Sequence, residues 1–142
     1  MPPATKILLL RNISFALQSV GPEGRGDHIT IDWAGQEHLL PEVTLRIPEW
    51  LLYCPAPHRA RVADVSATMT DRMAVWVERN WKINSEEDLN VYCFAVAGAV
   101  CMLFLSDIWE WFDGIRVDRG LAVAYGRAFQ SVNILKNIAE DA

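Results

Sequence analysis

The chain has 142 residues, a net charge of -5 and 51% hydrophobic residues, with six Trp among them. This length and apolar content suit one folded domain with a substantial core, and they exclude a chain that is disordered over most of its length. The 13 Lys and Arg residues are scattered, which excludes the basic patch of a nucleic-acid-binding protein. Three cysteines without a C-x-x-C pair form neither a disulfide framework nor a zinc site, so we expect reduced thiols and a cytoplasmic protein.

The first part of the chain predicts two long helices separated by an irregular segment. Apolar residues at helical spacing predict a helix over residues 5–20, and Gly21 ends it and opens an exposed loop. Four prolines within residues 29–57 limit that stretch to one or two short helices and irregular chain. ITIDW, at residues 29–33, alternates like a strand but has no visible partner strand. Helical spacing returns over residues 58–80.

The second part predicts two more helices. Ser85 is followed by three acidic residues, a favourable helix start, and the helix is expected to run toward Trp109. Its uncharged run, residues 91–106, is shorter than the roughly 20 apolar residues of a membrane-spanning helix, so we favour a buried core helix over one that dips into a membrane. A charged loop over residues 112–118 precedes a last helix that begins near Arg119. The expected fold class is therefore all-α.

The last helix carries a regular polar stripe. Gln130, Asn133, Asn137 and Asp141 are separated by three, four and four residues, which places them on one face of a helix. Carboxylate and amide oxygens are the ligands that Mg²⁺ prefers, with substrate phosphate completing its shell. The stripe therefore indicates a magnesium site beside a diphosphate, and a solvated helix face is the alternative.

Two segments resemble the squalene and phytoene synthases. GRAFQSVNILKNIAED, at residues 126–141, is similar to their second metal-binding motif, Q-x-x-N-I-L-R-D-x-x-E-D. YCFAVAGAV, at residues 92–100, is similar to their Y-C-x-x-V-A-G-x-V segment. Residues 64–74 resemble the family's M-x-x-G-M-A helix, and residues 6–17 resemble its K-x-x-L-L helix. The resemblance covers most of the chain and is weak only over residues 21–57.

This resemblance implies the class I isoprenoid-synthase fold, a helical bundle around an apolar tunnel. Residues 1–142 would form a single partial domain of that type, with residues 21–57 irregular or insert-like. The implied activity is the head-to-head condensation of two prenyl diphosphates, farnesyl or geranylgeranyl. In that reaction Mg²⁺ assists ionisation of an allylic diphosphate, and an apolar wall excludes water.

The resemblance also assigns roles to individual residues. Asn133, Asn137 and Asp141 match the metal ligands, and Tyr92 matches a catalytic tyrosine whose ring stabilises a cation. The other matching positions are implied to bind substrate, and they are Gln130, Lys136, Val96, Ala97, Val100, Ala122, Tyr125 and Phe129.

Several positions depart from the family's pattern. Asn137 stands where the family has Asp, Lys136 where it has Arg, and Arg72 and Cys101 where it has Gly. The family's first motif, D-x-x-x-D, does not occur in the 142 residues. We therefore expect an internal piece of a larger enzyme or a reduced relative. The alternative function is a non-catalytic binding or assembly module derived from the same fold.

Exposed apolar surface raises two further expectations. The pair Trp109 and Trp111 favours a peripheral membrane contact, although a buried aromatic cluster is the commoner arrangement. Uncovered tunnel walls favour self-association of the chain.

Overall fold

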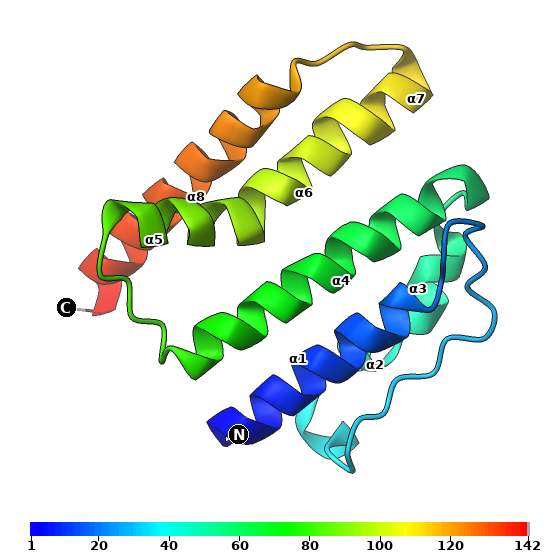
Figure 1. Cartoon of the computed structure of the whole chain (residues 1–142), viewed down its shortest axis with the longest axis horizontal. Helices are drawn as coiled ribbons and strands as arrows, with labels where there is room; N and C mark the ends of the chain where they lie inside the picture. The colour runs from blue at the N-terminus through cyan, green and yellow to red at the C-terminus, as the bar shows by residue number, and fades with distance from the viewer. Residues whose placement is uncertain (142) are drawn as a thin grey trace. The chain divides into compact units, whose positions relative to one another are not determined.

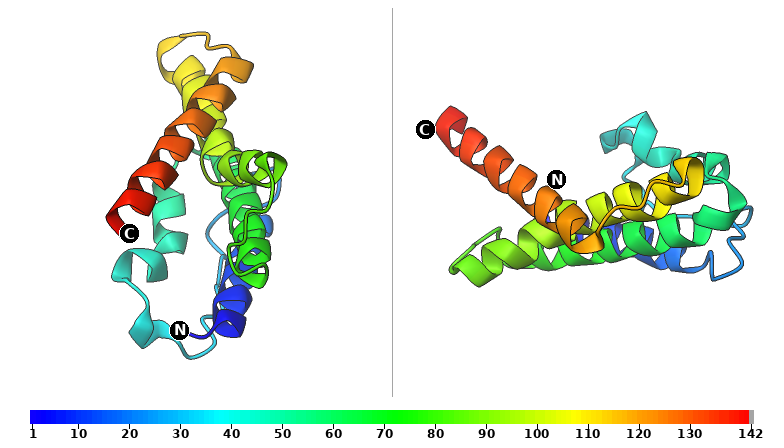
Figure 2. Two further views of the ribbon diagram at one scale, coloured as in Figure 1. Left: turned by 90° about the vertical axis from the view of Figure 1, so that its left-hand side faces the viewer. Right: turned by 90° about the horizontal axis from the view of Figure 1, so that it is seen from above.

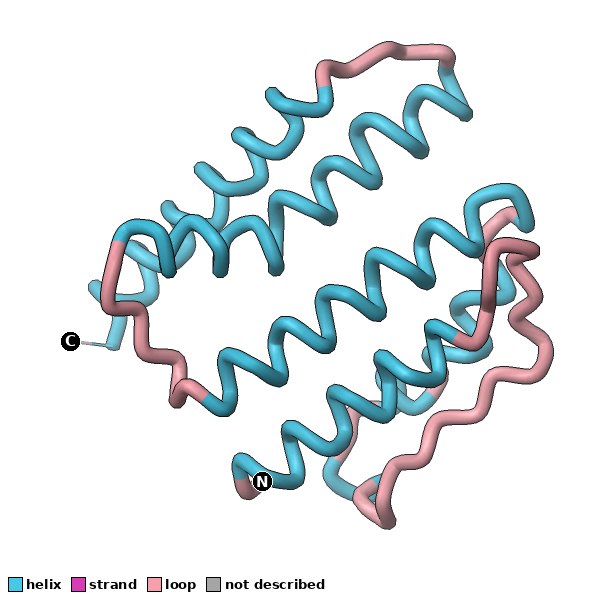
Figure 3. The backbone as a smooth tube through the Cα atoms, in the orientation of Figure 1, coloured by secondary structure: helices cyan, strands magenta, loops and turns pink. Residues whose placement is uncertain are grey.

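The computed structural model describes the backbone of residues 1–141 and the side chains of residues 1–137 (Figure 1). Helices and loops make up this part of the chain, and no strand occurs within it (Figure 3). The predicted all-α fold class is confirmed. The chain divides into two compact units, Met1–Trp81 and Lys82–Ala142, and each is described by itself. The expectation of a single domain over residues 1–142 stays a prediction.

The first unit contains two long helices and three short helical segments. The long helices are α1, Pro3–Gln18, and α4, Ala56–Glu78, which lie side by side and antiparallel (Figure 1). Between them come the 3₁₀ turn η1, Glu37–Leu39, and the short helices α2, Glu42–Leu45, and α3, Ile47–Tyr53. Prolines stand in the first turns of α1, α3 and α4, where the missing N–H costs no hydrogen bond.

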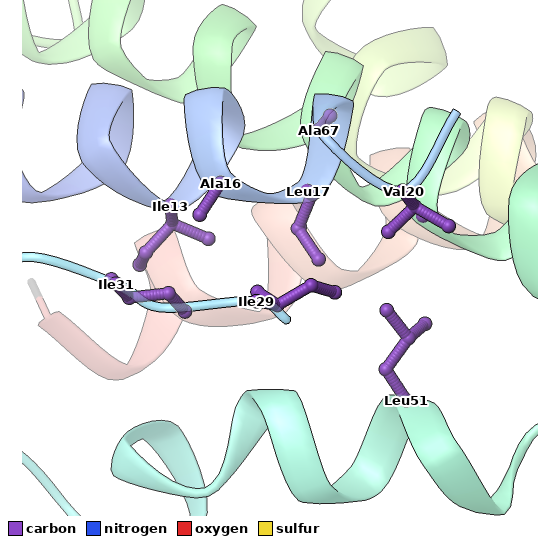
Figure 4. Packing of buried hydrophobic residues seen from close by; sticks show 9 residues of the cluster. Ile13, Ala16, Leu17, Val20, Ile29, Ile31, Leu51 and Ala67 are labelled. Atoms are coloured by element: carbon purple, nitrogen blue, oxygen red, sulfur yellow. The ribbon is translucent and has the colours of Figure 1, made fainter. Parts of the chain in front are cut away.

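The core of the first unit lies between α1, α4 and α3 (Figure 4). Ile29 and Ile31 enter it from extended chain, which explains the alternation of ITIDW without a strand, since no neighbouring strand lies beside it in the described residues. The buried Ser14 hydroxyl donates a 2.9 Å hydrogen bond to the Ala67 carbonyl and joins α1 to α4. The remaining buried members of the cluster are Ile13, Ala16, Leu17, Val20, Leu51, Ala63 and Ala67.

Arg59, in the first turn of α4, binds carbonyl groups at the end of α3. Its Nε donates to the Leu51 carbonyl at 3.2 Å, and its Nη2 donates to the Leu52 and Cys54 carbonyls at 3.2 and 3.1 Å. Its Nη1 donates to the Gly24 carbonyl at 3.1 Å, in the loop that follows α1. The last carbonyls of a helix lack partners within the helix, so this guanidinium replaces a C-terminal cap and fixes α3 to α4.

The second unit is a hairpin of two long helices. The first, Glu86–Asp113, is continuous and contains two π-helical segments. In chain order its parts are α5 (Glu86–Cys93), η2 (Phe94–Gly98), α6 (Ala99–Cys101), η3 (Met102–Ile108) and α7 (Trp109–Asp113). The Ser85 hydroxyl caps its start by accepting the Asp88 N–H at 3.0 Å, as the sequence predicts. Left-handed Gly114 ends it, so the loop begins two residues later than predicted.

The second helix of the hairpin is α8, Arg119–Asp141. Its start is capped by the Asp118 carboxylate, which accepts the Leu121 N–H at 2.9 Å. The helix crosses the η2–α6 region closely, because a Cβ atom added to Gly126 would lie 2.7 Å from the Ala97 carbonyl oxygen and 3.0 Å from the Cys101 Cβ. Only glycine fits this crossing without moving the two helices apart.

The helix Glu86–Asp113 has 28 residues and a hydropathy of 2.0 over its most apolar window, so length and composition would allow it to cross a membrane. Only 28% of that window is buried. Cys93, Ala95 and Leu103 are buried, whereas Phe104 and Trp109 are about half exposed. The expectation of a buried core helix therefore holds for one face of the helix Glu86–Asp113, and not for Phe104 and Trp109.

Replacing Arg59 with Met should lower the free energy of unfolding of the first unit by about 2–3 kcal/mol, because four carbonyl groups lose a charged donor. Hydrogen exchange of the α1 and α4 amides measures this change. The control is Arg25→Met, which removes an ion pair with Glu23 whose side chains are 74% and 70% exposed, and it should cost less than about 0.5 kcal/mol. Equal effects of the two substitutions would contradict the capping role.

Gly126→Ala should destabilise the second unit by about 1–3 kcal/mol, because the new Cβ overlaps the Ala97 backbone. The sign is diagnostic, since alanine normally stabilises a helix interior by about 0.5–1 kcal/mol relative to glycine. At Gly120 the added Cβ meets only the Asp118 carboxylate oxygen, at 3.0 Å, so Gly120→Ala should be neutral or slightly stabilising. Urea unfolding followed by circular dichroism compares the two, and a stabilising Gly126→Ala would refute the close crossing.

Candidate functional site

Every residue to which the sequence assigns a role lies in the second unit. The helix Glu86–Asp113 carries Tyr92, Val96, Ala97 and Val100, and α8 carries the others. The close crossing at Gly126 brings the site residues of the two helices together. Gly126 faces η2, and Gln130 and Asn133 follow it at spacings of four and three, which places them on the same face of α8.

The polar stripe of α8 starts beside the crossing and continues beyond it. Ala122 is buried, and Gln130 and Asn133 are half-buried, whereas Asn137 is exposed. The right-hand view of Figure 2 shows why, since the C-terminal end of α8 diverges from α5 after the crossing. Lys136 is also exposed, on the flank of the stripe. The side chain of Asp141, the fourth member of the predicted stripe, lies outside the described residues.

Tyr92 and Gln130 lie across the hairpin from each other, near enough for the Gln130 side chain to hydrogen-bond the phenol and influence its pKa. Burial raises the pKa of the Tyr92 phenol, the neighbouring Cys93 raises it further, and the hydrogen bond with Gln130 lowers it in part. Next to this pair, the Cys93 and Ser131 side chains approach to 3.6 Å between Sγ and Oγ. The half-buried ring of Tyr92 therefore stays neutral at ordinary pH and lies beside the first polar residue of the stripe.

The predicted apolar wall divides into a packed part and an exposed part. Ala97 lies against Gly126, and Ala122 is 2% exposed. Tyr125 and Phe129 stack with ring centres 6.3 Å apart but are 60% and 56% exposed. They belong to a broad apolar face on α8 that also includes Leu121, Val132 and Leu135. The assignment of all these residues to a substrate tunnel stays a prediction.

In the described part of the stripe, the side-chain oxygens that could bind Mg²⁺ belong to neutral amides. Asn133 and Asn137, four residues apart, present amide oxygens on one face, which suits a hard cation. No group of three or more His, Cys, Asp or Glu side chains gathers among the described residues. The donor type therefore fits Mg²⁺, but most of the negative charge has to come from the ligand's phosphates or from Asp141.

Gly126 is a structural residue of the candidate site that the sequence alone did not single out. It supplies no chemistry but determines how closely α8 approaches the helix that holds Tyr92. A signal was present, because Ala122 and Gly126 are small residues four apart on the face of α8 that continues into the stripe at Gln130, and small side chains allow two helices to pack closely.

The raised pKa of Tyr92 gives a test of its burial. The folded chain holds the phenol proton more tightly than the unfolded chain, so this stabilisation is present below the ordinary tyrosine value of 10.0 and is lost as pH rises through the folded pKa. The free energy of unfolding should fall above pH 10 in the wild type and fall less in Tyr92→Phe. Tyr125→Phe, at an exposed ring, should behave as the wild type does; urea unfolding between pH 8 and pH 11 measures all three. Identical pH dependence of wild type and Tyr92→Phe would contradict the account.

One of three comparisons with known proteins found a match. No curated protein and no solved structure matches the chain. The model of the squalene/phytoene synthase family matches residues 44–142, a stretch that includes α3, α4 and the whole of the second unit. This match covers more than half of the chain and contains every predicted site residue. The chain therefore belongs to the squalene/phytoene synthase family.

Proposed function

We propose that the chain contributes one half of the active site of a prenyltransferase of squalene/phytoene synthase type. The reaction would condense two prenyl diphosphates, farnesyl or geranylgeranyl, head to head with the help of Mg²⁺. The observation that supports this proposal most directly is the meeting of Tyr92 with Gln130 at the head of a stripe of oxygen ligands. A catalytic aromatic ring and the diphosphate-binding face would then be adjacent.

The residues of the hairpin have distinct tasks in this proposal. Asn133, Asn137 and Asp141 would hold Mg²⁺, and Lys136 would place a positive point charge near the diphosphate. Bound Mg²⁺ supplies Lewis-acid stabilisation of the leaving diphosphate. The allylic C–O bond breaks with its electron pair on the diphosphate, the double bond of the second prenyl chain supplies the pair for the new C–C bond, and loss of a proton closes a cyclopropane ring.

Tyr92, Val96 and Val100 would protect the carbocation formed in this step. The neutral phenol ring presents its face to positive charge without acting as a nucleophile, and its raised pKa maintains the neutral form. The apolar side chains at Val96 and Val100 would exclude water, which would otherwise trap the cation.

The proposal predicts opposite effects of two substitutions in the stripe. Asn137→Asp adds a charged ligand and should lower the Mg²⁺ concentration needed for half-maximal diphosphate release by about tenfold. Asn133→Ala removes a ligand and should raise it by about tenfold or more. Release of diphosphate from farnesyl diphosphate, followed in the full-length protein, measures both. Asn90→Asp is the matched control, because it adds the same charge at an exposed position of α5 and should change nothing.

The second candidate function is a non-catalytic binding or assembly module. Asn137 favours it, because the family has a charged Asp at this position. Saturable binding of a non-hydrolysable farnesyl thiodiphosphate, without diphosphate release by either wild type or Asn137→Asp, would identify this function. Mg²⁺-dependent release by the wild type would exclude it.

We also propose a cytoplasmic, peripherally membrane-associated protein that self-associates. The exposed apolar face of α8 and the half-exposed Trp109 and Trp111 support these contacts. Light scattering and fractionation with and without detergent test the two associations separately.

A further inference from the structure

A second candidate ligand site lies in the first unit, on helices other than those that carry the stripe. A cavity of about 290 Å³ opens between α1, α3 and α4. Ile13 and Leu17 line it from α1, and Leu51 lines it from α3. These three side chains belong to the core of this unit and are no more than 7% exposed, so the cavity reaches into the core (Figure 4).

The volume of the cavity suits a small molecule. Pockets for small molecules begin at about 300 Å³. An apolar protein cavity of about 150 Å³ stays dry and accepts benzene. If the number of carbon atoms scales with the volume, a cavity of about twice the volume that holds benzene accommodates a molecule of roughly ten carbon atoms.

The lining selects a neutral ligand. None of the residues that line the cavity is charged, and the side-chain polar groups among them include the Cys54 thiol and the Ser66 and Thr70 hydroxyls. The Thr70 hydroxyl already donates to the Ser66 and Ala67 carbonyls, at 3.1 and 2.9 Å. Burial raises the pKa of the Cys54 thiol, which therefore stays uncharged. A diphosphate or carboxylate placed here would lose its hydration without a compensating charge.

We propose that this cavity binds one neutral aliphatic alcohol of about ten carbons, with its chain against Ile13, Leu17 and Leu51 and its hydroxyl near Ser66. The chemistry of this site is the opposite of that on α8, where amides and Lys136 suit a diphosphate. The two sites lie in different compact units, so the inference does not depend on the proposed prenyltransferase activity.

Filling the cavity tests the proposal directly. Geraniol, titrated into the full-length protein by calorimetry, should bind saturably with one site per chain. Ser66→Leu places a larger side chain at the cavity wall and should weaken this binding at least tenfold. Thr68→Leu is the matched control, because Thr68 is exposed on the same helix and does not line the cavity, and it should leave binding unchanged.

Two further measurements separate this site from the one on α8 and from misfolding. Asn133→Ala should not change geraniol binding, and geranyl diphosphate should not compete for the cavity. In the wild type, geraniol should slow alkylation of Cys54, read from the Cys54 peptide by mass spectrometry. Lack of saturable binding, wild-type affinity in Ser66→Leu, or unchanged alkylation of Cys54 at saturating geraniol would each overturn the proposal.

Discussion

The contact between Gly126 and the backbone of Ala97 determines the geometry of the second unit. Because Gly126 has no side chain, α8 approaches η2 closely enough for Gln130, one turn later, to reach Tyr92. A bulkier residue at position 126 would push the whole of α8 away from η2, and Gln130 would move away from Tyr92. Beyond this contact the two helices diverge (Figure 2), which leaves Asn137 in solvent. The crossing thus places one part of the stripe against an aromatic ring and leaves the rest open to a ligand.

The first unit depends on a different device, the anchoring of a helix too short to be stable alone. α3 has seven residues, and isolated helices of that length do not persist in water. Arg59 holds its last carbonyls, while the Trp50 indole N–H donates to the Val43 carbonyl at 3.0 Å and the Arg46 guanidinium lies 4.8 Å from the centre of the same ring. With α3 fixed by polar contacts, its apolar side need not collapse fully onto α1 and α4. That explains how a cavity persists beside a packed core.

The sequence predicted the long helices well because their signals are local. Helical spacing located α1, α4 and α8, and Ser85 marked the start of α5. The π-helical segments were not predicted, since Phe94–Gly98 and Met102–Ile108 contain no proline or other local marker. Arg59 was missed for a related reason, because its carbonyl partners are defined only once α3 has folded. In the site, spacing alone placed the stripe on one face, whereas the meeting of Tyr92 with Gln130 depends on tertiary packing.

The charge of the stripe constrains any function of the hairpin. Asn133 and Asn137 donate oxygen atoms without charge, and Mg²⁺ gives up its hydration only for strong ligands. The described part of the site should therefore bind Mg²⁺ weakly by itself, and a diphosphate bound without Mg²⁺ would lack the divalent charge that offsets its own. Each ligand supplies the charge that the other needs, so Mg²⁺ and diphosphate should bind with strong positive coupling. A carboxylate at position 137 would weaken that coupling by holding the metal before the substrate arrives. If the stripe binds Mg²⁺ and diphosphate as proposed, Asn137 favours a site that assembles only when both ligands are present.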